Sequence, residues 1–117
     1  MPGSDSVRLL CWNLEWCPLP SGRSRRGKIG QAIIERQQPD IACLTEARLG
    51  WFADEDGSVV TSEPLAESHH MHRHDGRKIL LWSRTGWSDI DHAGSEDIRD
   101  FARFVAATTQ TPFAHCA

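Results

Sequence analysis

Two short apolar runs near the N-terminus are typical of β-strands, and the amphipathic segment between them is typical of a helix. The first run, Val7–Asn13, is apolar on both faces, which predicts an interior strand. The second run, Ile41–Glu46, follows a proline and an aspartate. Between them, Lys28–Gln38 carries apolar residues at helical spacing and stops before Pro39. A strand, a helix and a strand within about 40 residues predict a crossover unit, whose two strands are parallel and are neighbours or near neighbours.

Three further segments carry strand patterns. Ser58–Ser62 contains two adjacent valines and predicts a short strand, and Lys78–Ser83 predicts a longer one. Trp87 and Ile90 are expected to mark the next edge of the sheet. Phe101–Thr109 is rich in strand-forming residues, and no crossover helix precedes it, so we expect a strand antiparallel to Lys78–Ser83. The chain is therefore predicted to be an α/β or α+β protein with a mixed β-sheet.

Each of the first two strands ends in a polar residue that could bind a cation. Asn13 ends the first strand and Glu46 ends the second. Parallel strands end at the same edge of a sheet, and adjacent strands lie roughly 4.8 Å apart, so the two side chains are expected to converge. Amide and carboxylate oxygens suit Mg²⁺ or Mn²⁺. The alternative is that Asn13 caps local backbone groups and that Glu46 is an ordinary surface carboxylate.

Short motifs spread along the chain resemble one enzyme superfamily. They are Trp12-Asn13-Leu14, Gln38-Pro39-Asp40-Ile41, Leu44-Thr45-Glu46, the run from Gly76 to Arg84 and the run from Phe101 to Thr109. Together they are similar to the opening of the endonuclease/exonuclease/phosphatase superfamily, which includes DNase I, exonuclease III-type repair enzymes and inositol polyphosphate phosphatases. The resemblance covers residues 7 to about 112, and its most specific part is Asn13 together with the Pro-Asp pair and Glu46.

The resemblance implies a metal-dependent phosphodiesterase or phosphomonoesterase with a four-layer α/β/β/α sandwich. It assigns Glu46 as a ligand of Mg²⁺ (or Mn²⁺) and Asn13 as its catalytic and metal-binding helper. Asn13 is the only asparagine, so the later Gly-Asp-x-Asn motif of the superfamily is absent, and its Ser-Asp-His segment is not found. We therefore expect the N-terminal half of that fold, a truncated form with negligible turnover. The substrate is left open among DNA, RNA, a phosphoinositide and a small phosphoester.

An alternative function is that of a non-catalytic remnant or binding domain. Half of a two-sheet sandwich leaves one sheet face uncovered, and soluble monomers rarely expose an apolar patch of that size. Such a face would pair with another chain, so self-association is the corresponding expectation.

The composition fits one small domain. With 117 residues, 39% hydrophobic and 25% charged, the chain resembles an ordinary soluble globular protein. We expect a loose N-terminus at residues 1–6, one partial domain at residues 7–112 and a truncated tail at residues 113–117. The net charge of −3 argues against binding nucleic acid through the whole surface, although a local basic patch suffices for a nuclease. No run approaches the roughly 20 apolar residues of a membrane span, and no secretory signal is evident, so we expect a cytoplasmic protein without membrane contact.

Three further groups of residues carry candidate chemistry, each with an ordinary alternative. The four cysteines show no C-x-x-C spacing and are expected to be buried free thiols, with a disulfide or zinc site as the alternative. A basic cluster at the expected helix start either contacts phosphate or is a solvated loop. The histidine-rich tract is either a loop or a metal-binding module. Their members are Cys11, Cys17, Cys43 and Cys116; Arg23, Arg25, Arg26 and Lys28; and the tract His69–His74. Glu15, two residues past Asn13, either contacts metal or lies at the rim of the site.

Overall fold

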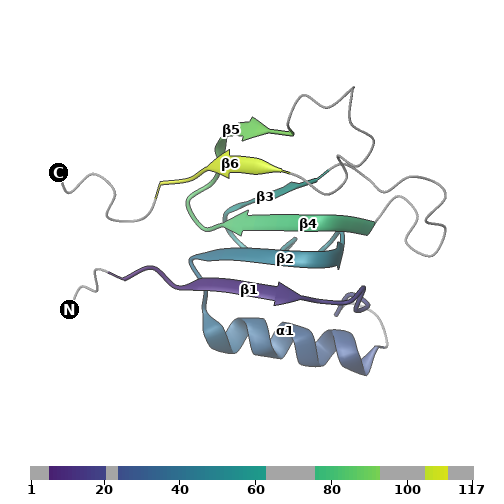
Figure 1. Cartoon of the computed structure of the whole chain (residues 1–117). Coiled ribbons are helices and arrows are strands. Elements are labelled where there is room, and N and C mark those ends of the chain that lie inside the picture. The colour runs from purple at the N-terminus through teal and green to yellow at the C-terminus, as the bar shows by residue number, and fades with distance from the viewer. Residues whose placement is uncertain (1–5, 21–23, 63–75, 93–104, 111–117) are drawn as a thin grey trace.

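A computed structural model describes residues 6–20, 24–62, 76–92 and 105–110 (Figure 1). The fold is mixed α+β, with one helix, a mixed four-stranded sheet and a separate two-stranded sheet in this part of the chain. The elements are β1 (Leu9–Asn13), α1 (Arg25–Gln37), β2 (Ile41–Arg48), β3 (Ser58–Thr61), β4 (Gly76–Ser83), β5 (Ser88–Asp91) and β6 (Ala106–Thr108). No described helix is long and apolar enough to cross a membrane.

The predicted crossover unit is confirmed. β1 and β2 are parallel neighbours, with Leu9 opposite Ile41 and Asn13 opposite Thr45. β4 lies antiparallel to β2 on its other side, and β3 completes the order β1-β2-β4-β3. The carboxyl ends of β1 and β2 therefore meet at one edge of the sheet.

The helix begins three residues earlier than the sequence pattern predicted. Ser24 caps it, because the Ser24 hydroxyl accepts a hydrogen bond from the Gly27 backbone N–H at 3.1 Å. This cap fixes the start at Arg25 although the first turn carries basic residues and no acidic ones. At the other end, Gln38 adopts a left-handed conformation with a φ of 47° and donates its backbone N–H to the Ile34 carbonyl, which ends the helix before the proline.

One face of the four-stranded sheet carries the core. Leu44 and Leu80 are fully buried at opposite positions of β2 and β4. Ile34 from α1 and Trp51 from the turn after β2 belong to the same cluster. Phe52 extends this cover, since its ring stacks on Trp82 with a centroid distance of 4.7 Å. The helix and the segment after β2 thus cover the same side of the sheet.

The opposite face of the sheet is only partly buried. Its residues alternate with the core residues along each strand. Leu9 is 61% exposed, and Ile41, Ile79 and Leu81 are of intermediate exposure. The described residues therefore leave an apolar sheet face in contact with solvent.

Two strand predictions were wrong. β1 is the edge strand of the described sheet, not an interior strand, and its residues alternate between exposed and intermediate burial. The segment predicted as Phe101–Thr109 contributes Ala106–Thr108, which pairs with Ser88–Asp91 in the second sheet and not with β4. In the described chain, β2 lies on one side of β4, and β3 lies along Leu80–Ser83 on its other side. Residues 101–104 of the predicted segment lie outside the described residues.

The second strand was predicted to end at Glu46, but β2 continues to Arg48. The strand predicted at Ser58–Ser62 is present as β3, and Lys78–Ser83 lies within β4. The histidine tract, residues 1–5 of the predicted loose N-terminus and the predicted tail lie outside the described residues.

Candidate functional site

The carboxyl edge of β1 and β2 brings together the two residues that the sequence singled out. Asn13 is the last residue of β1 and lies opposite Thr45, the residue before Glu46. The chain after Asn13 keeps following β2, since Leu14 donates its N–H to the Thr45 carbonyl at 2.9 Å and Trp16 donates to the Glu46 carbonyl at 2.8 Å. Asn13 and Glu46 are therefore close along the same edge.

The side chain of Asn13 organises the turn that follows β1. Its Oδ1 accepts a hydrogen bond from the Glu15 backbone N–H at 3.0 Å. Glu15 and Trp16 both have left-handed backbones, with φ values of 51° and 62°. Asn13 thus makes the local capping contact that was the alternative to a ligand role. One amide oxygen can accept two hydrogen bonds or bind an ion beside one, so this contact is compatible with either role.

Glu46 interrupts the regular alternation of side-chain burial along β2. Its φ is 49°, and both Leu44 and Ala47 are fully buried although they lie three positions apart. Its carboxylate is 31% exposed and lies 3.5 Å from the Lys78 ammonium on β4. The same ammonium lies 5.5 Å from the centre of the Trp16 ring. A left-handed backbone thus places Glu46 at a kink, beside a cation that neutralises it.

The oxygen donors at this edge are fewer than an enclosed metal centre needs. One carboxylate and one amide oxygen are within reach of the edge, and Glu15 adds an exposed carboxylate on the adjoining turn. Mg²⁺ is commonly held by one or two carboxylates, with waters and substrate phosphates completing its shell. No group of three or more His, Cys, Asp or Glu side chains in the described residues is arranged to hold a metal. Lys78 would compete with any cation for Glu46.

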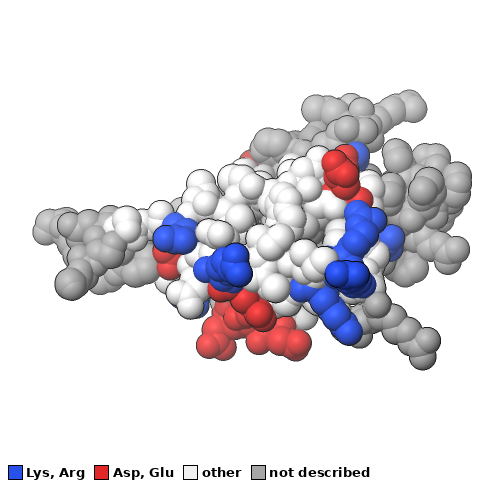
Figure 2. Space-filling view, turned by 90° about the horizontal axis from the view of Figure 1, so that it is seen from below, with Lys and Arg blue, Asp and Glu red and all other residues white. Residues whose placement is uncertain are grey.

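A cavity of about 360 Å³ lies between β1 and α1 next to this edge. Its lining includes Asn13, Glu15 and Arg26. Arg26 is exposed in the first turn of α1, where Arg25 and Lys28 are exposed too. Figure 2 shows Lys and Arg side chains gathered at the end of the molecule from which α1 starts. The predicted basic cluster, as far as it is described, therefore lies beside Asn13.

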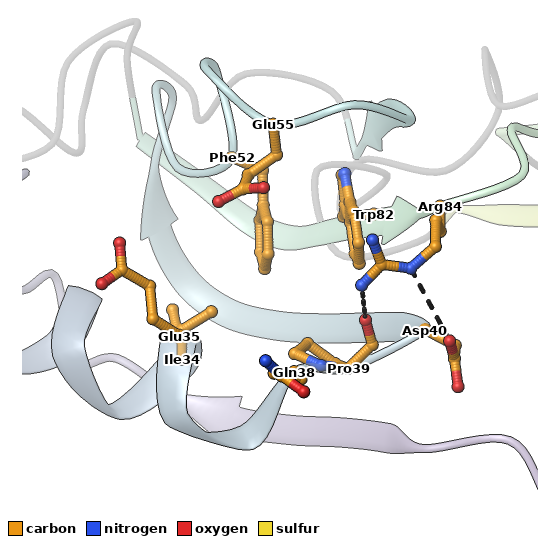
Figure 3. A pocket seen from close by; sticks show the side chains of 9 residues that line it. All are labelled: Ile34, Glu35, Gln38, Pro39, Asp40, Phe52, Glu55, Trp82 and Arg84. Carbon is orange, nitrogen blue, oxygen red and sulfur yellow. Dashed lines mark hydrogen bonds and ion pairs between the residues drawn. The ribbon is translucent and has the colours of Figure 1, made fainter.

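A larger cavity, of about 580 Å³, lies at the other end of β2 and was not predicted (Figure 3). Arg84 lies 5.3 Å from the centre of the Trp82 ring, donates to the Pro39 carbonyl at 2.8 Å and pairs with Asp40 at 3.7 Å. Glu35 and Glu55 also line this cavity. The lining comes from three separate stretches of the chain, residues 34–40, 52–55 and 82–84. The Pro-Asp pair before β2 was its only sequence signal.

The cysteines differ from their predicted burial. Cys17, in the turn after β1, is buried, whereas Cys11 on β1 is exposed and Cys43 on β2 is of intermediate exposure. The prediction of buried thiols was wrong for Cys11, because its strand is at an edge and its side chain lies on the open face. All three are free thiols.

Comparison with known proteins gives no relative for this chain: neither a protein-family model nor a curated protein sequence matches it.

Proposed function

We propose that this chain carries the metal-binding edge of a phosphoesterase of the endonuclease/exonuclease/phosphatase type. In this proposal Glu46 is the ligand of Mg²⁺ or Mn²⁺, and Asn13 is the helper that orients phosphate. The observation that carries it is the parallel pairing of β1 with β2, which sets Asn13 opposite the residue before Glu46. The sequence resemblance around Asn13 and Glu46 is the second support.

A bound Mg²⁺ would polarise a phosphoryl oxygen and neutralise charge during phosphoester cleavage. The chain's own residues contribute the position of the ion and of the substrate. Arg26 lines the cavity beside Asn13, where a guanidinium is suited to phosphate. The substrate proposed is therefore a phosphoester, with nucleic acid among the candidates. The proposed architecture is the N-terminal half of a four-layer sandwich, acting in the cytoplasm.

Metal binding tests the assignment of Glu46 directly. Mn²⁺ is titrated into the protein, and bound ion is followed by electron paramagnetic resonance. Glu46→Gln is expected to abolish binding, because the substitution removes the carboxylate charge at constant size. Glu35→Gln is the matched control, since Glu35 is an exposed carboxylate on α1 whose contact is with Gln31. Equal Mn²⁺ affinity in the wild type and in Glu46→Gln would contradict the proposal.

Lys78→Met gives an independent result in the opposite direction. Lys78 pairs with Glu46 across a partly exposed contact, and such pairs contribute about 1 kcal/mol or less. Removing the ammonium is therefore expected to strengthen Mn²⁺ binding by up to about fivefold. A weaker affinity would mean that the ion does not bind at this carboxylate.

Turnover is expected to be negligible for this chain alone. The site offers an ion position and a phosphate-orienting amide, but the sequence lacks the superfamily motifs that carry the general base. Cleavage of bis-p-nitrophenyl phosphate and of plasmid DNA with Mg²⁺ measures this. Strong cleavage that Glu46→Ala abolishes would show that the catalytic set is more complete than proposed.

The second candidate function is that of a binding domain that associates through the open sheet face. The exposure of Leu9 and the partial exposure of Ile41 and Leu81 favour it. Light scattering is expected to detect a dimer that Leu9→Glu weakens. Ile29→Glu is the matched control, because Ile29 is 51% exposed but lies on α1. A wild-type protein that is monomeric at high concentration and binds no apolar dye would refute this function.

A further inference from the structure

Two cysteines face each other on neighbouring strands of the open sheet face. Cys11 of β1 and Cys43 of β2 are directly paired in the parallel register. Paired residues on adjacent strands direct their side chains to the same face, and adjacent strands lie about 4.8 Å apart. This separation is within the range of roughly 4.4–6.8 Å that disulfides span between Cα atoms. The two thiols are therefore neighbours on one surface.

The environment leaves this pair open to reagents. Cys11 is exposed, and Cys43 is of intermediate exposure. Burial, and then the charge of the neighbouring Cys11, raise the pKa of the Cys43 thiol. Cys17, by contrast, is buried, and its thiol donates to the Pro18 carbonyl at 3.5 Å.

We propose that Cys11 and Cys43 form a dithiol site that a small disulfide, such as oxidised glutathione, closes to an intramolecular disulfide between β1 and β2. This site is separate from the proposed phosphoesterase function and does not depend on it. The ligand class is a low-molecular-weight disulfide, because the exposed Cys11 admits a small reagent on a flat sheet surface.

The reaction proceeds by two exchanges. The thiolate of Cys11, the more exposed of the two cysteines, attacks one sulfur of the small disulfide and displaces one small thiolate, leaving a mixed disulfide on the protein. The Cys43 thiolate then attacks the protein-bound sulfur, and the second small thiolate leaves. The protein loses two protons and two electrons, and the small disulfide is reduced to two thiols.

Mass spectrometry of the full chain after incubation with oxidised glutathione tests the closure. The expected product has lost the mass of two hydrogen atoms and carries no glutathione at this pair. A tethered thiol has an effective concentration in the millimolar range, so at micromolar protein the internal disulfide is expected to exceed linked dimers by on the order of a thousandfold. Cys11→Ser and Cys43→Ser are each expected to retain one glutathionyl group instead.

The linked residues can be assigned by tryptic mapping. Trypsin is expected to release residues 9–23, which contain Cys11 and Cys17, and residues 37–48, which contain Cys43. Cys17→Ala removes the ambiguity in the first peptide and is expected to leave the cross-link intact. A cross-link that disappears in Cys17→Ala, or that joins residue 116 to either strand, would overturn the proposal.

Phenylarsine oxide tests the same proximity without oxidation, because it needs two thiols to bind tightly. One equivalent is expected to protect Cys11 and Cys43 together from a thiol reagent in the wild type and in Cys17→Ala. Protection should be lost in each serine variant at those two positions. Stable glutathionylation of both cysteines without closure, combined with no arsenical protection, would refute the site.

Discussion

Gly27 of α1 offers a sharp test of the packing that holds the candidate edge in place. A Cβ at this position would lie 2.5 Å from both the Pro18 and the Leu19 carbonyl oxygens. These atoms belong to the backbone of the loop that follows the Asn13 turn, so they cannot rotate out of the way. Gly30 lies one turn farther along, where a Cβ would meet two side chains and no backbone: the Trp51 ring at 3.1 Å and the Trp12 ring at 3.9 Å. The two glycines therefore form a matched pair in one helix.

The expected magnitudes follow from two opposing effects. Alanine in place of glycine gains at most about 1 kcal/mol of helix propensity. Overpacking costs about 1–3 kcal/mol, and backbone contacts belong at the upper end. Gly27→Ala is therefore expected to lower the free energy of unfolding by about 2 kcal/mol, whereas Gly30→Ala stays within about 1 kcal/mol of the wild type.

Urea unfolding followed by tryptophan fluorescence measures both variants. A second readout is the reaction of Cys17 with a thiol reagent, because this buried thiol lies in the same loop and should become accessible when the loop moves. Gly27→Ala with wild-type stability and a protected Cys17 would refute the close contact between the loop and the helix. Equal destabilisation by both variants would mean that the cost arises in the helix itself.

Three further predictions concern the helix cap at Ser24, the carboxylate of Asp40 and the thiol of Cys43. Ser24→Ala removes the hydroxyl that caps α1 and is expected to lower the free energy of unfolding by about 1 kcal/mol. Ser24→Asp keeps a side-chain acceptor for the cap and is expected to keep the wild-type stability; thermal unfolding measures both variants. Asp40→Ala removes the acceptor of the Arg8 backbone N–H before β1 and the ion-pair partner of Arg84. The free energy of unfolding, measured in urea, is expected to fall by about 1–2 kcal/mol. No change would mean that neither contact contributes to stability. Because the pKa of Cys43 is raised in the fold, its alkylation in Cys11→Ser should require a higher pH than that of a cysteine in an unfolded peptide. The same shift means that the free energy of unfolding falls as the pH rises through the folded pKa of Cys43. Alkylation of Cys43 at the pH that suffices for an unfolded peptide would contradict the raised pKa.

Local sequence signals were sufficient for the elements that depend on neighbouring residues. The apolar runs of β1 and β2, and the proline after the helix, predicted a crossover unit, and its parallel register is present. Such a unit follows from short-range pattern and from the handedness of the connection. The start of the helix was missed, because the basic first turn pointed away from a helix while the Ser24 cap was the better signal.

Long-range pairing was decided only by the tertiary structure. Ala106–Thr108 has a strand pattern, but no pattern within it specifies β5 as the partner. The same holds for the surroundings of the candidate site. That Lys78 neutralises Glu46 depends on the antiparallel register of β2 and β4, which residues distant in sequence establish.

The sequence by itself determined that the first two strands are parallel neighbours, and hence that Asn13 lies beside the part of β2 that contains Glu46. The tertiary structure decided what surrounds them: a capping contact at Asn13, a left-handed kink and a cation at Glu46, and an exposed Cys11 where a buried thiol was expected. The physical reason is that strand direction follows from local chain geometry, whereas burial and charge pairing depend on which distant segments occupy each face of the sheet.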